Sequence, residues 1–327
     1  MAGRRAKLLL RLWLFLEHRL ITDMNQHRAN NAFSALIVTA AIIFTGYCKK
    51  MSAPGEPHAG AIVRTILETK RQLDCKDCLF LAFWDFDGTI LKGDCSEGLM
   101  QDGRVIYRGL VEQTIEKGFS SVFRRNEAKE FFEEYRRRDE TLGHKNSYSF
   151  LATQYAGADP TEIEDFARKI FESTYQLYYF QSSLQMLRGL QNSGIENHIV
   201  SASPEFFVRG AAHTLGLDPA QINGIRLQMA DGKLTSRIAP PLTYAEGKTQ
   251  RIQEIVQSIE KANPGKTVYI LAGFGNSYHT DGPFLKFIQN QQFPAGKPVS
   301  VMINGGEAPP EFEGFWTVSQ GQTQGGF

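Results

Sequence analysis

The sequence predicts an α/β fold, in which a mostly parallel sheet carries helices and a block of helices follows the first strand. Three observations lead to this prediction. Leu79 to Trp84 is a run of six apolar residues, too short for a buried helix and typical of a strand covered on both faces. Strand and helix patterns alternate from Asn197 to Asn304, as in a parallel sheet with crossovers. Residues 94–193, between these regions, show helical patterns.

Length and composition are those of an ordinary globular protein. The chain has 327 residues, of which 42% are hydrophobic and 22% are charged. Its net charge of +1 predicts no broad electrostatic surface for nucleic acid. Cys75 and Cys78 form a CxxC pair, and the remaining cysteines, Cys48 and Cys95, form no second pair that would complete a zinc site. A local disulfide and two free thiols both remain open for the CxxC pair.

The N-terminal region has the features of a membrane segment. Residues 1–31 are basic, and Ala32 to Cys48 is an uncharged stretch of seventeen residues. This stretch has the length of a short transmembrane helix or of a signal-peptide core. Positive charge is denser before it than after it, which places the large C-terminal part outside the cytoplasm, periplasmic or extracellular. We therefore expect a signal anchor and a membrane-anchored protein.

Three alternatives to a retained anchor remain open. Met24 is an alternative start, which would leave a short basic segment before the apolar stretch. Cys48 could carry a lipid, giving a lipoprotein, although Tyr47 before it fits such a signal poorly, and cleavage would give a secreted form. A buried core helix is disfavoured because the stretch lacks a polar face.

The rest of the chain divides into a linker, a core, a cap and a tail. Residues 49–74 are expected to form a Pro/Gly-containing linker and a lead helix over Ala61 to Leu73. The helical block 94–193 separates the first strand from the later ones, so the core consists of residues 75–93 plus 194–310 and the block is a cap. Residues 311–327 are expected to be a loose tail. Within the block, helices are predicted over Asn126 to Leu142, from Asp159-Pro160 onward, and over Ser182 to Asn192.

In the second part of the core, a hairpin around Asp231-Gly232 precedes the helix Gly247 to Ala262. The strand Thr267 to Phe274, the helix Gly282 to Gln289 and the strand Pro298 to Asn304 follow.

Polar side chains occur where these predicted elements meet the sheet edge. Asp85 and Asp87 follow the first strand, Ser201 ends the strand that begins at Asn197, and Lys248 lies at a helix start. The loop Asn276 to Asp281 follows another strand. Because the carboxyl ends of parallel strands meet at one edge of a sheet, we expect these groups to lie together.

The order and surroundings of these motifs resemble the haloacid dehalogenase (HAD) superfamily of phosphatases, in the branch with a helical cap after the first motif, which includes phosphoserine phosphatase. The resemblance covers residues 79–304, and its most specific motif is Asp85-Phe86-Asp87-Gly88-Thr89. It implies a Rossmann-like core with an inserted helical cap. It also implies a magnesium-dependent phosphomonoester hydrolase that forms an aspartyl-phosphate.

The resemblance assigns roles to individual residues. Asp85 would attack phosphorus, and Asp87 would protonate the leaving alcohol and then activate water. Ser201 would bind a phosphate oxygen, and Lys248 would neutralise the phosphate. Further phosphate donors would be Gly88 and Thr89.

Mg²⁺ would be held by Asp85, the main-chain carbonyl of Asp87 and the fourth motif. That motif departs from the family pattern, because Asn276 stands where the first acid is expected and Asp281 follows five residues later. Asn276 can still ligate through its amide oxygen, with Asp281 as the charged ligand. One negative charge fewer predicts weaker metal binding. His279, in the same loop, is expected to be solvated.

The substrate prediction depends on Asp94, nine residues after Asp85, which matches the carboxylate that meets the substrate ammonium in phosphoserine phosphatases. With Glu97, it favours an aminated or quaternary-ammonium phosphomonoester, such as phosphoserine, phosphocholine or phosphoethanolamine. The alternative is an acidic start to the first cap helix.

Two rival functions remain open. The same scaffold could cleave a carbon–halogen or phosphonate bond, although Asp87 suits an alkoxide leaving group better. The altered fourth motif would also fit a non-catalytic module that binds phosphate or a partner.

Overall fold

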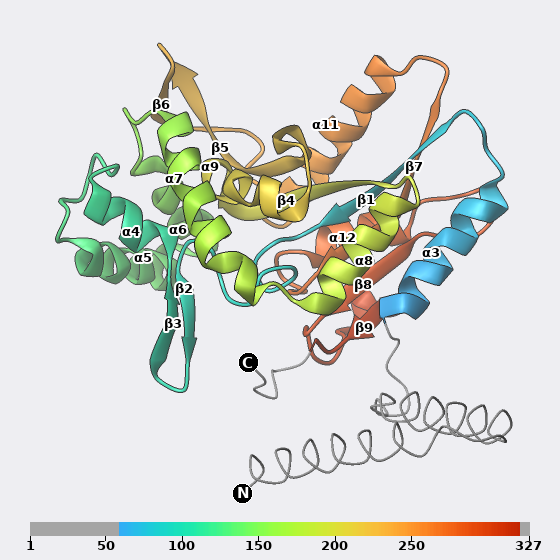
Figure 1. The fold of residues 1–327 in the computed structure, drawn as a ribbon, viewed down its shortest axis with the longest axis horizontal. Coiled ribbons are helices and arrows are strands. Elements are labelled where there is room, and N and C mark those ends of the chain that lie inside the picture. Colours follow the sequence, from blue (N-terminus) through green and yellow to red (C-terminus); the bar gives the residue numbers. More distant parts are fainter. Residues whose placement is uncertain (1–58, 321–327) are drawn as a thin grey trace, which may run out of the picture. The chain divides into compact units, whose positions relative to one another are not determined.

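The central element is a seven-stranded sheet. The computed structural model describes residues 59–320, and Figure 1 shows their arrangement. The strand order is β6-β5-β4-β1-β7-β8-β9. All neighbouring strands in this sheet pair in parallel, except β5 and β6 at one edge. The strands are β1 (Cys78–Trp84), β4 (Glu196–Pro204), β5 (Ile222–Ala230), β6 (Lys233–Ala239), β7 (Thr267–Gly275), β8 (Val299–Ile303) and β9 (Trp316–Val318). The predicted α/β fold is confirmed.

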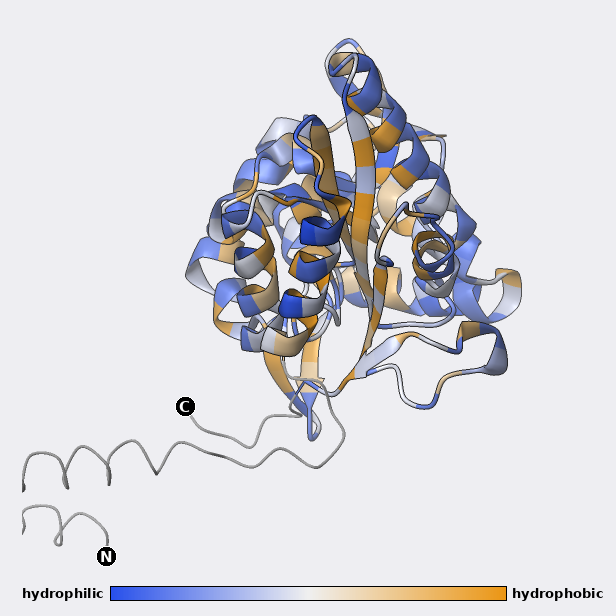
Figure 2. Cartoon of the chain, turned by 90° about the vertical axis from the view of Figure 1, so that its right-hand side faces the viewer, coloured by the Kyte–Doolittle hydropathy of each residue, from blue (hydrophilic) through white to orange (hydrophobic). Residues whose placement is uncertain are grey.

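Strand β1 lies at the centre because both of its faces are apolar. Phe80, Ala82 and Trp84 belong to one buried cluster, and Leu81 and Phe83 belong to a second. Alternate residues of a strand point to opposite faces, so the sheet has a core on each side. Figure 2 shows the hydrophobic strands between the helical layers. Helices α3 (Ala59–Leu73) and α8 (Gln181–Asn192) cover the first face, and α11 (Glu246–Ala262) and α12 (Gly282–Gln289) cover the second.

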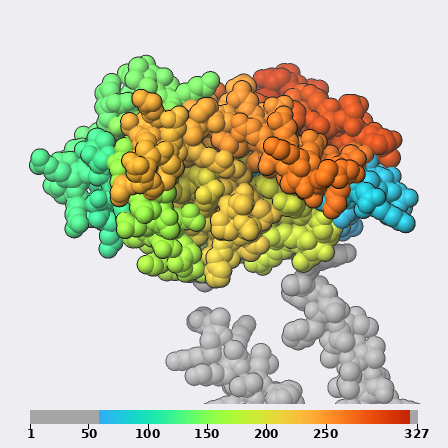
Figure 3. Space-filling model, turned by 90° about the horizontal axis from the view of Figure 1, so that it is seen from above, coloured from blue at the N-terminus to red at the C-terminus, as the bar shows by residue number. Residues whose placement is uncertain are grey.

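The chain between β1 and β4 contains five α-helices, of which the second, fourth and fifth were predicted individually. They are α4 (Leu110–Lys117), α5 (Ala128–Leu142), α6 (His144–Thr153), α7 (Pro160–Ser173) and α8. Asp159 caps α7 as predicted, because its side chain accepts a hydrogen bond from the Thr161 amide at 2.8 Å. Helix α8 packs on α3 and on β4, so it covers the sheet. Within residues 59–320, helices α4 and α5 lie at the opposite end from α3 (Figure 3).

A wholly helical block was a wrong prediction for residues 94–193. An antiparallel hairpin of β2 (Gly98–Gln101) and β3 (Arg104–Arg108) precedes α4. Its turn residues, Asp102 and Gly103, both have positive φ (51° and 73°), as a tight hairpin turn requires. Asp102-Gly103 is the same signal that correctly predicts the hairpin at Asp231-Gly232.

The loose tail predicted for residues 311–327 is wrong up to residue 318. Pro310–Phe312 forms a 3-10 turn, and β9 extends the sheet through parallel pairing with β8. Cys75, just before β1, forms a disulfide with Cys78, the first residue of β1, and Cys95 is a free, buried cysteine.

The predicted membrane segment at residues 32–48 and the basic region before it lie outside the described residues. None of the helices between residues 59 and 320 is long and apolar enough to cross a membrane.

Candidate active site

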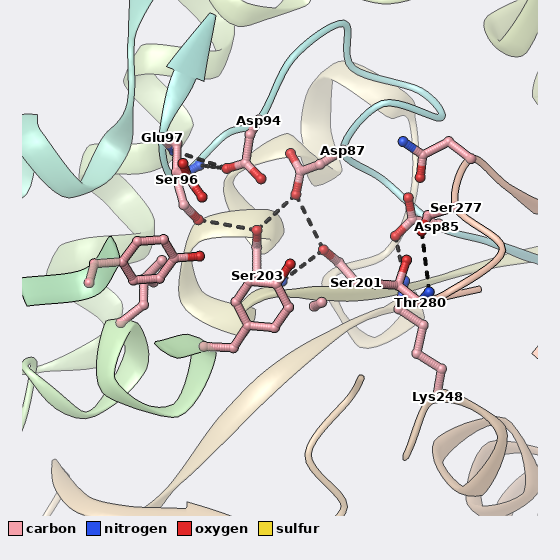
Figure 4. A pocket seen from close by; sticks show the side chains of 15 residues that line it. Asp85, Asp87, Asp94, Ser96, Glu97, Ser201, Ser203, Lys248, Ser277 and Thr280 are labelled. Carbon is pink, nitrogen blue, oxygen red and sulfur yellow. Dashed lines mark hydrogen bonds and ion pairs between the residues drawn. The ribbon is translucent and has the colours of Figure 1, made fainter. Parts of the chain in front are cut away.

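The carboxyl ends of β1, β4 and β7 surround a polar cavity of about 210 Å³ (Figure 4). Asp85 follows β1, Ser201 and Ser203 lie near the end of β4, and Asn276 follows β7. Lys248 reaches the cavity from the first turn of α11. Four predicted groups from distant parts of the sequence therefore meet at one place. The cavity is lined by Asp85, Asp87, Asp94, Ser96, Glu97, Tyr135, Tyr148, Leu151, Ser201, Ala202, Ser203, Lys248, Asn276, Ser277 and Thr280.

Asp85 is 5% exposed and is held through both carboxylate oxygens. Lys248 Nζ donates to its Oδ1 at 2.6 Å, and Thr89 Oγ1 donates to its Oδ2 at 2.9 Å. Burial raises the pKa of Asp85 to about 6, with a further contribution from Asp281, while Lys248 opposes the rise. The carboxyl group thus has a defined orientation at the cavity wall.

Lys248 bridges two carboxylates in the interior. Its Nζ also donates to Asp281 Oδ1 at 2.6 Å, and its side chain is 1% exposed. Burial alone would lower the pKa of Lys248, but the carboxylates of Asp281 and Asp85 outweigh it and raise the pKa above its ordinary value. The lysine therefore supplies a fixed positive charge beside Asp85.

Asp87 accepts hydrogen bonds from three N–H and O–H groups and, at 3.6 Å, from the Cys95 thiol. The Cys95 amide donates to Oδ1 at 2.7 Å, and Ser203 and Ser201 hydroxyls donate to Oδ2 at 2.8 and 3.4 Å. Burial, with the negative charges of Asp94 and Asp85, raises the pKa of Asp87 well above its ordinary value. The environment therefore favours the protonated form that a general acid needs.

Asp94 and Glu97 form an acidic wall on the opposite side of Asp87 from Lys248 (Figure 4). Asp94 Oδ1 accepts from the amides of Ser96 and Glu97 at 2.6 and 2.9 Å. Burial raises the pKa of Asp94, and burial together with Asp94 raises the pKa of Glu97 to about 7. The alternative role for Asp94 as the start of a helix is wrong, because the next helix begins at Leu110.

A family model for haloacid dehalogenase-like hydrolases matches residues 82–286, which is more than half of the chain. The chain belongs to this family. The predicted family and the prediction of a hydrolase are confirmed. No match was found among curated proteins.

Several solved structures are similar to this chain at low sequence identity. A protein of unknown function from Bordetella pertussis Tohama I has a TM-score of 0.53 and 16% identity over 74% of this chain and 99% of that one. A functionally unknown protein from Anaerococcus prevotii DSM 20548 has a TM-score of 0.50 and 15% identity over 77% of this chain and 87% of that one. A phosphoserine phosphatase in its apo form has a TM-score of 0.38 and 18% identity over 68% of this chain and 85% of that one.

The donors at the cavity of this HAD hydrolase suit a hard divalent cation. Carboxylates of Asp85 and Asp87 and the side chain of Asn276 line it, and oxygen ligands of this kind are those that Mg²⁺ prefers. Asn276 also contacts the first motif, since a Cβ on Gly88 would lie 1.9 Å from Asn276 Nδ2.

Asp281 was expected to be the charged metal ligand, and the structure places it elsewhere. Its Oδ1 accepts from Lys248, and its Oδ2 accepts from the amides of Asn276 and Ser277 at 2.9 and 3.1 Å. It is 0% exposed and is not among the cavity-lining residues. In this structure Asp281 holds the lysine and the loop, and its role as the charged metal ligand stays a prediction.

The predicted phosphate donors Gly88 and Thr89 have other hydrogen-bond partners in the structure. The Gly88 amide donates to the carbonyls of Leu91 and Gly93 at 2.8 and 3.0 Å, because the loop after β1 closes on itself. The Thr89 hydroxyl donates to Asp85. Neither residue lies on the cavity wall, and Thr89 instead orients the predicted nucleophile.

Several cavity residues were missed from the sequence. Ser203 could have been found, because it lies two residues after Ser201 on one strand and such residues share a face. Tyr135 and Tyr148 come from α5 and α6, and nothing in their local sequence points to the cavity. His279 is exposed, as expected for a loop histidine, and its Nε2 hydrogen-bonds to the Tyr244 hydroxyl.

Proposed function

We propose that this HAD hydrolase is a magnesium-dependent phosphomonoesterase that uses Asp85 as its nucleophile. The observation that carries this proposal is the arrangement of Asp85, oriented by Lys248 and Thr89, with the carboxyl group of Asp87 beside the same cavity. Phosphoryl transfer requires a placed nucleophile and positive charge around the phosphate oxygens. Mg²⁺, when bound, would supply charge that lets a carboxylate approach a phosphate dianion.

The residues of the chain account for both halves of the reaction. An oxygen of Asp85 forms a bond to phosphorus while the bond from phosphorus to the leaving alcohol breaks, and Asp87 gives its proton to that alcohol. Asp87, now ionised, takes a proton from water, which attacks phosphorus and breaks the bond to Asp85. Inorganic phosphate leaves, and both carboxyl groups return to their first states. Ser201, on the cavity wall, would turn its hydroxyl proton from Asp87 Oδ2 to a phosphate oxygen.

The cavity also supports a substrate class. We propose a small phosphomonoester whose alcohol carries a positive charge. Asp94 and Glu97 provide negative charge beyond Asp87, and Lys248 is the one lysine or arginine among the cavity-lining residues of the described chain. That lysine already pairs with Asp85 and Asp281. Among the cavity-lining residues, a carboxylate on the leaving group would find no unpaired cation; Arg136, whose charge lowers the pKa of Glu97, is outside that lining. This favours phosphoethanolamine or phosphocholine over phosphoserine.

Hydrolysis of p-nitrophenyl phosphate with and without Mg²⁺ tests the reaction. We expect turnover that depends on Mg²⁺ and falls by about a thousandfold or more in Asp85→Asn, because the nucleophile is removed. Folded wild-type protein without activity at any Mg²⁺ concentration would favour the binding module instead.

Comparison of phosphoethanolamine, phosphocholine, phosphoserine and a plain alkyl phosphate tests the substrate class. Asp94→Ala should raise KM for the aminated esters about tenfold or more and leave the plain ester nearly unchanged, since a charge-assisted contact is worth roughly 1.5–3 kcal/mol. Equal losses on all four esters would reject recognition of the ammonium group.

We also propose that the enzyme acts outside the cytoplasm, held by the apolar segment 32–48, which favours scavenging of phosphate or headgroups. Protease treatment of intact and permeabilised cells tests this. Degradation only after the inner membrane is opened would reject it.

A further inference from the structure

The hydrogen bonds around Asp87 form a short chain of serine hydroxyls. Ser96 Oγ donates to Ser203 Oγ at 3.1 Å, and Ser203 Oγ donates to Asp87 Oδ2 at 2.8 Å (Figure 4). Ser96 is 1% exposed and Ser203 is 6% exposed, so water competes little for these bonds. The other oxygen of Asp87 is held by the Cys95 amide. Both oxygens of the proposed acid are therefore oriented by the protein.

The backbone of β4 fixes Ser203 in this position. The pairing register of β4 with β5 shifts between Val200 and Pro204, a stretch that includes Ser203. Irregularities of this kind re-aim side chains next to active sites. Strand β5 then packs closely on the same stretch, because a Cβ on Gly224 would lie 2.5 Å from the Ser203 carbonyl oxygen. The Ser203 amide also donates to Ser201 Oγ at 3.0 Å.

A chain of hydroxyls can serve both protonation states of a carboxyl group. Each serine hydroxyl has one proton and can accept as well as donate. With Asp87 ionised, Ser203 donates to it. With the proton on Asp87 Oδ2, the carboxyl donates to Ser203, whose own proton turns toward Ser96. The switch of Asp87 from acid to base then needs only hydroxyl rotations.

We propose that Ser203, supported by Ser96, is a positioning residue that orients Asp87 as general acid and base. This inference rests on the proposed phosphatase function and adds a role that the first motif alone does not predict. Ser96 belongs to the segment after β1, and its carbonyl accepts from the Val111 amide in α4 at 3.0 Å. Ser96 therefore connects the hydrogen-bond chain of Asp87 to the first turn of α4.

The test compares leaving groups that need protonation with one that does not. Nitrophenolate is a stable anion, whereas an alkoxide needs a proton, so a misplaced acid slows alkyl phosphates most. In Ser203→Ala we expect kcat/KM for an alkyl phosphate to fall about 10–100-fold and kcat/KM for p-nitrophenyl phosphate to fall less than about threefold. We compare kcat/KM because it covers the steps through release of the alcohol, whereas kcat also includes the hydrolysis of the aspartyl-phosphate, in which Asp87 is the base for both esters. Ser203→Thr, which keeps the hydroxyl, should restore most of the alkyl phosphate rate. Ser96→Ala should give a smaller loss of the same kind.

Ser300→Ala is the matched control. Ser300 is 2% exposed and donates to the Leu285 carbonyl at 2.7 Å, away from the cavity. It should leave the ratio of the two rates unchanged. An equal loss of kcat/KM on both esters in Ser203→Ala would overturn the positioning role, while the active wild type upholds the phosphatase. Wild-type protein that hydrolyses neither ester would overturn both.

Discussion

At the scale of single residues, the site is organised by a buried cation between two carboxylates. Lys248 donates to Asp85 and Asp281 at 2.6 Å each, and all three side chains are nearly inaccessible. Removing one member of such a group leaves an uncompensated buried charge, which costs much more than the group contributes when complete. Lys248 therefore affects stability as well as the charge beside the nucleophile.

Lys248→Met should abolish turnover and lower the free energy of unfolding by about 3–5 kcal/mol, because two buried carboxylates lose their cation. Urea denaturation measures the second effect. Lys261→Met, on the exposed last turn of α11, should change the free energy by less than about 0.5 kcal/mol. Similar losses in both variants would contradict the central role of the buried charge.

The raised pKa of Glu97 predicts how the free energy of unfolding depends on pH. Burial, with Asp94, raises the pKa of its carboxyl from 4.5 to about 7. The folded protein therefore binds this proton more tightly than the unfolded chain. The stabilisation that the proton gives to the folded state is fully present below pH 4.5 and is lost as pH rises through 7.

Glu97→Gln should accordingly weaken the fall of unfolding free energy between pH 4.5 and 7 in the absence of Mg²⁺. Chemical denaturation at several pH values measures the slope. Glu133→Gln, at an exposed position of α5, should leave the slope as in the wild type. An unchanged slope in Glu97→Gln would show that this carboxyl titrates normally.

At the scale of elements, the close approach of a loop to α11 places Lys248. A Cβ on Gly247 would lie 1.7 Å from the Leu242 carbonyl oxygen, so any side chain there moves the start of the helix. The same backbone carries the lysine one residue later. Glycine is required here by contact with the backbone.

Gly247→Ala should lower kcat about tenfold or more and destabilise the protein by roughly 1–3 kcal/mol, because the helix start must shift. Thermal unfolding and p-nitrophenyl phosphate turnover measure the two effects. Gly60→Ala is the control, since a Cβ there would meet the Arg64 side chain at an ordinary 3.7 Å. It should be neutral or slightly stabilising. Wild-type turnover in Gly247→Ala would disprove the steric argument.

At the scale of the whole described unit, aromatic rings join α6 to the core beside the cavity. His144 and Tyr148 lie on α6, and they contact His279 and Tyr244 with ring centroids 5.5 and 5.4 Å apart. Tyr148 also lines the cavity, whereas Tyr244 does not. Tyr244 therefore supports one cavity wall from outside.

Tyr244→Ala should raise KM severalfold with a smaller effect on kcat, because Tyr148 loses its packing partner while the catalytic carboxyls keep theirs. Steady-state kinetics with p-nitrophenyl phosphate separate the two constants. Tyr269→Ala removes an aromatic ring packed on Phe80 and Phe293. It should leave KM unchanged. A loss confined to kcat in Tyr244→Ala would contradict a supporting role.

The sequence by itself determined the central strand, the order of the elements and the location of the site. Leu79 to Trp84 could be placed at the centre because it has no polar face, and Asp85, Ser201 and Lys248 could be grouped because strand ends share an edge. These conclusions depend on local patterns and on general rules of sheet topology. The hairpin at β2 and β3 was missed because its two short strands lay inside a region of helical spacing.

Only the tertiary structure decided which donor meets which acceptor. Asp281 turns to Lys248, Thr89 turns to Asp85, and Ser203 reaches Asp87 from a position 116 residues away. Such pairings depend on strand register and on the packing of distant segments to within a fraction of an ångström. Residue type and spacing do not contain that information, because the same serine or aspartate satisfies its hydrogen bonds equally well with several neighbours.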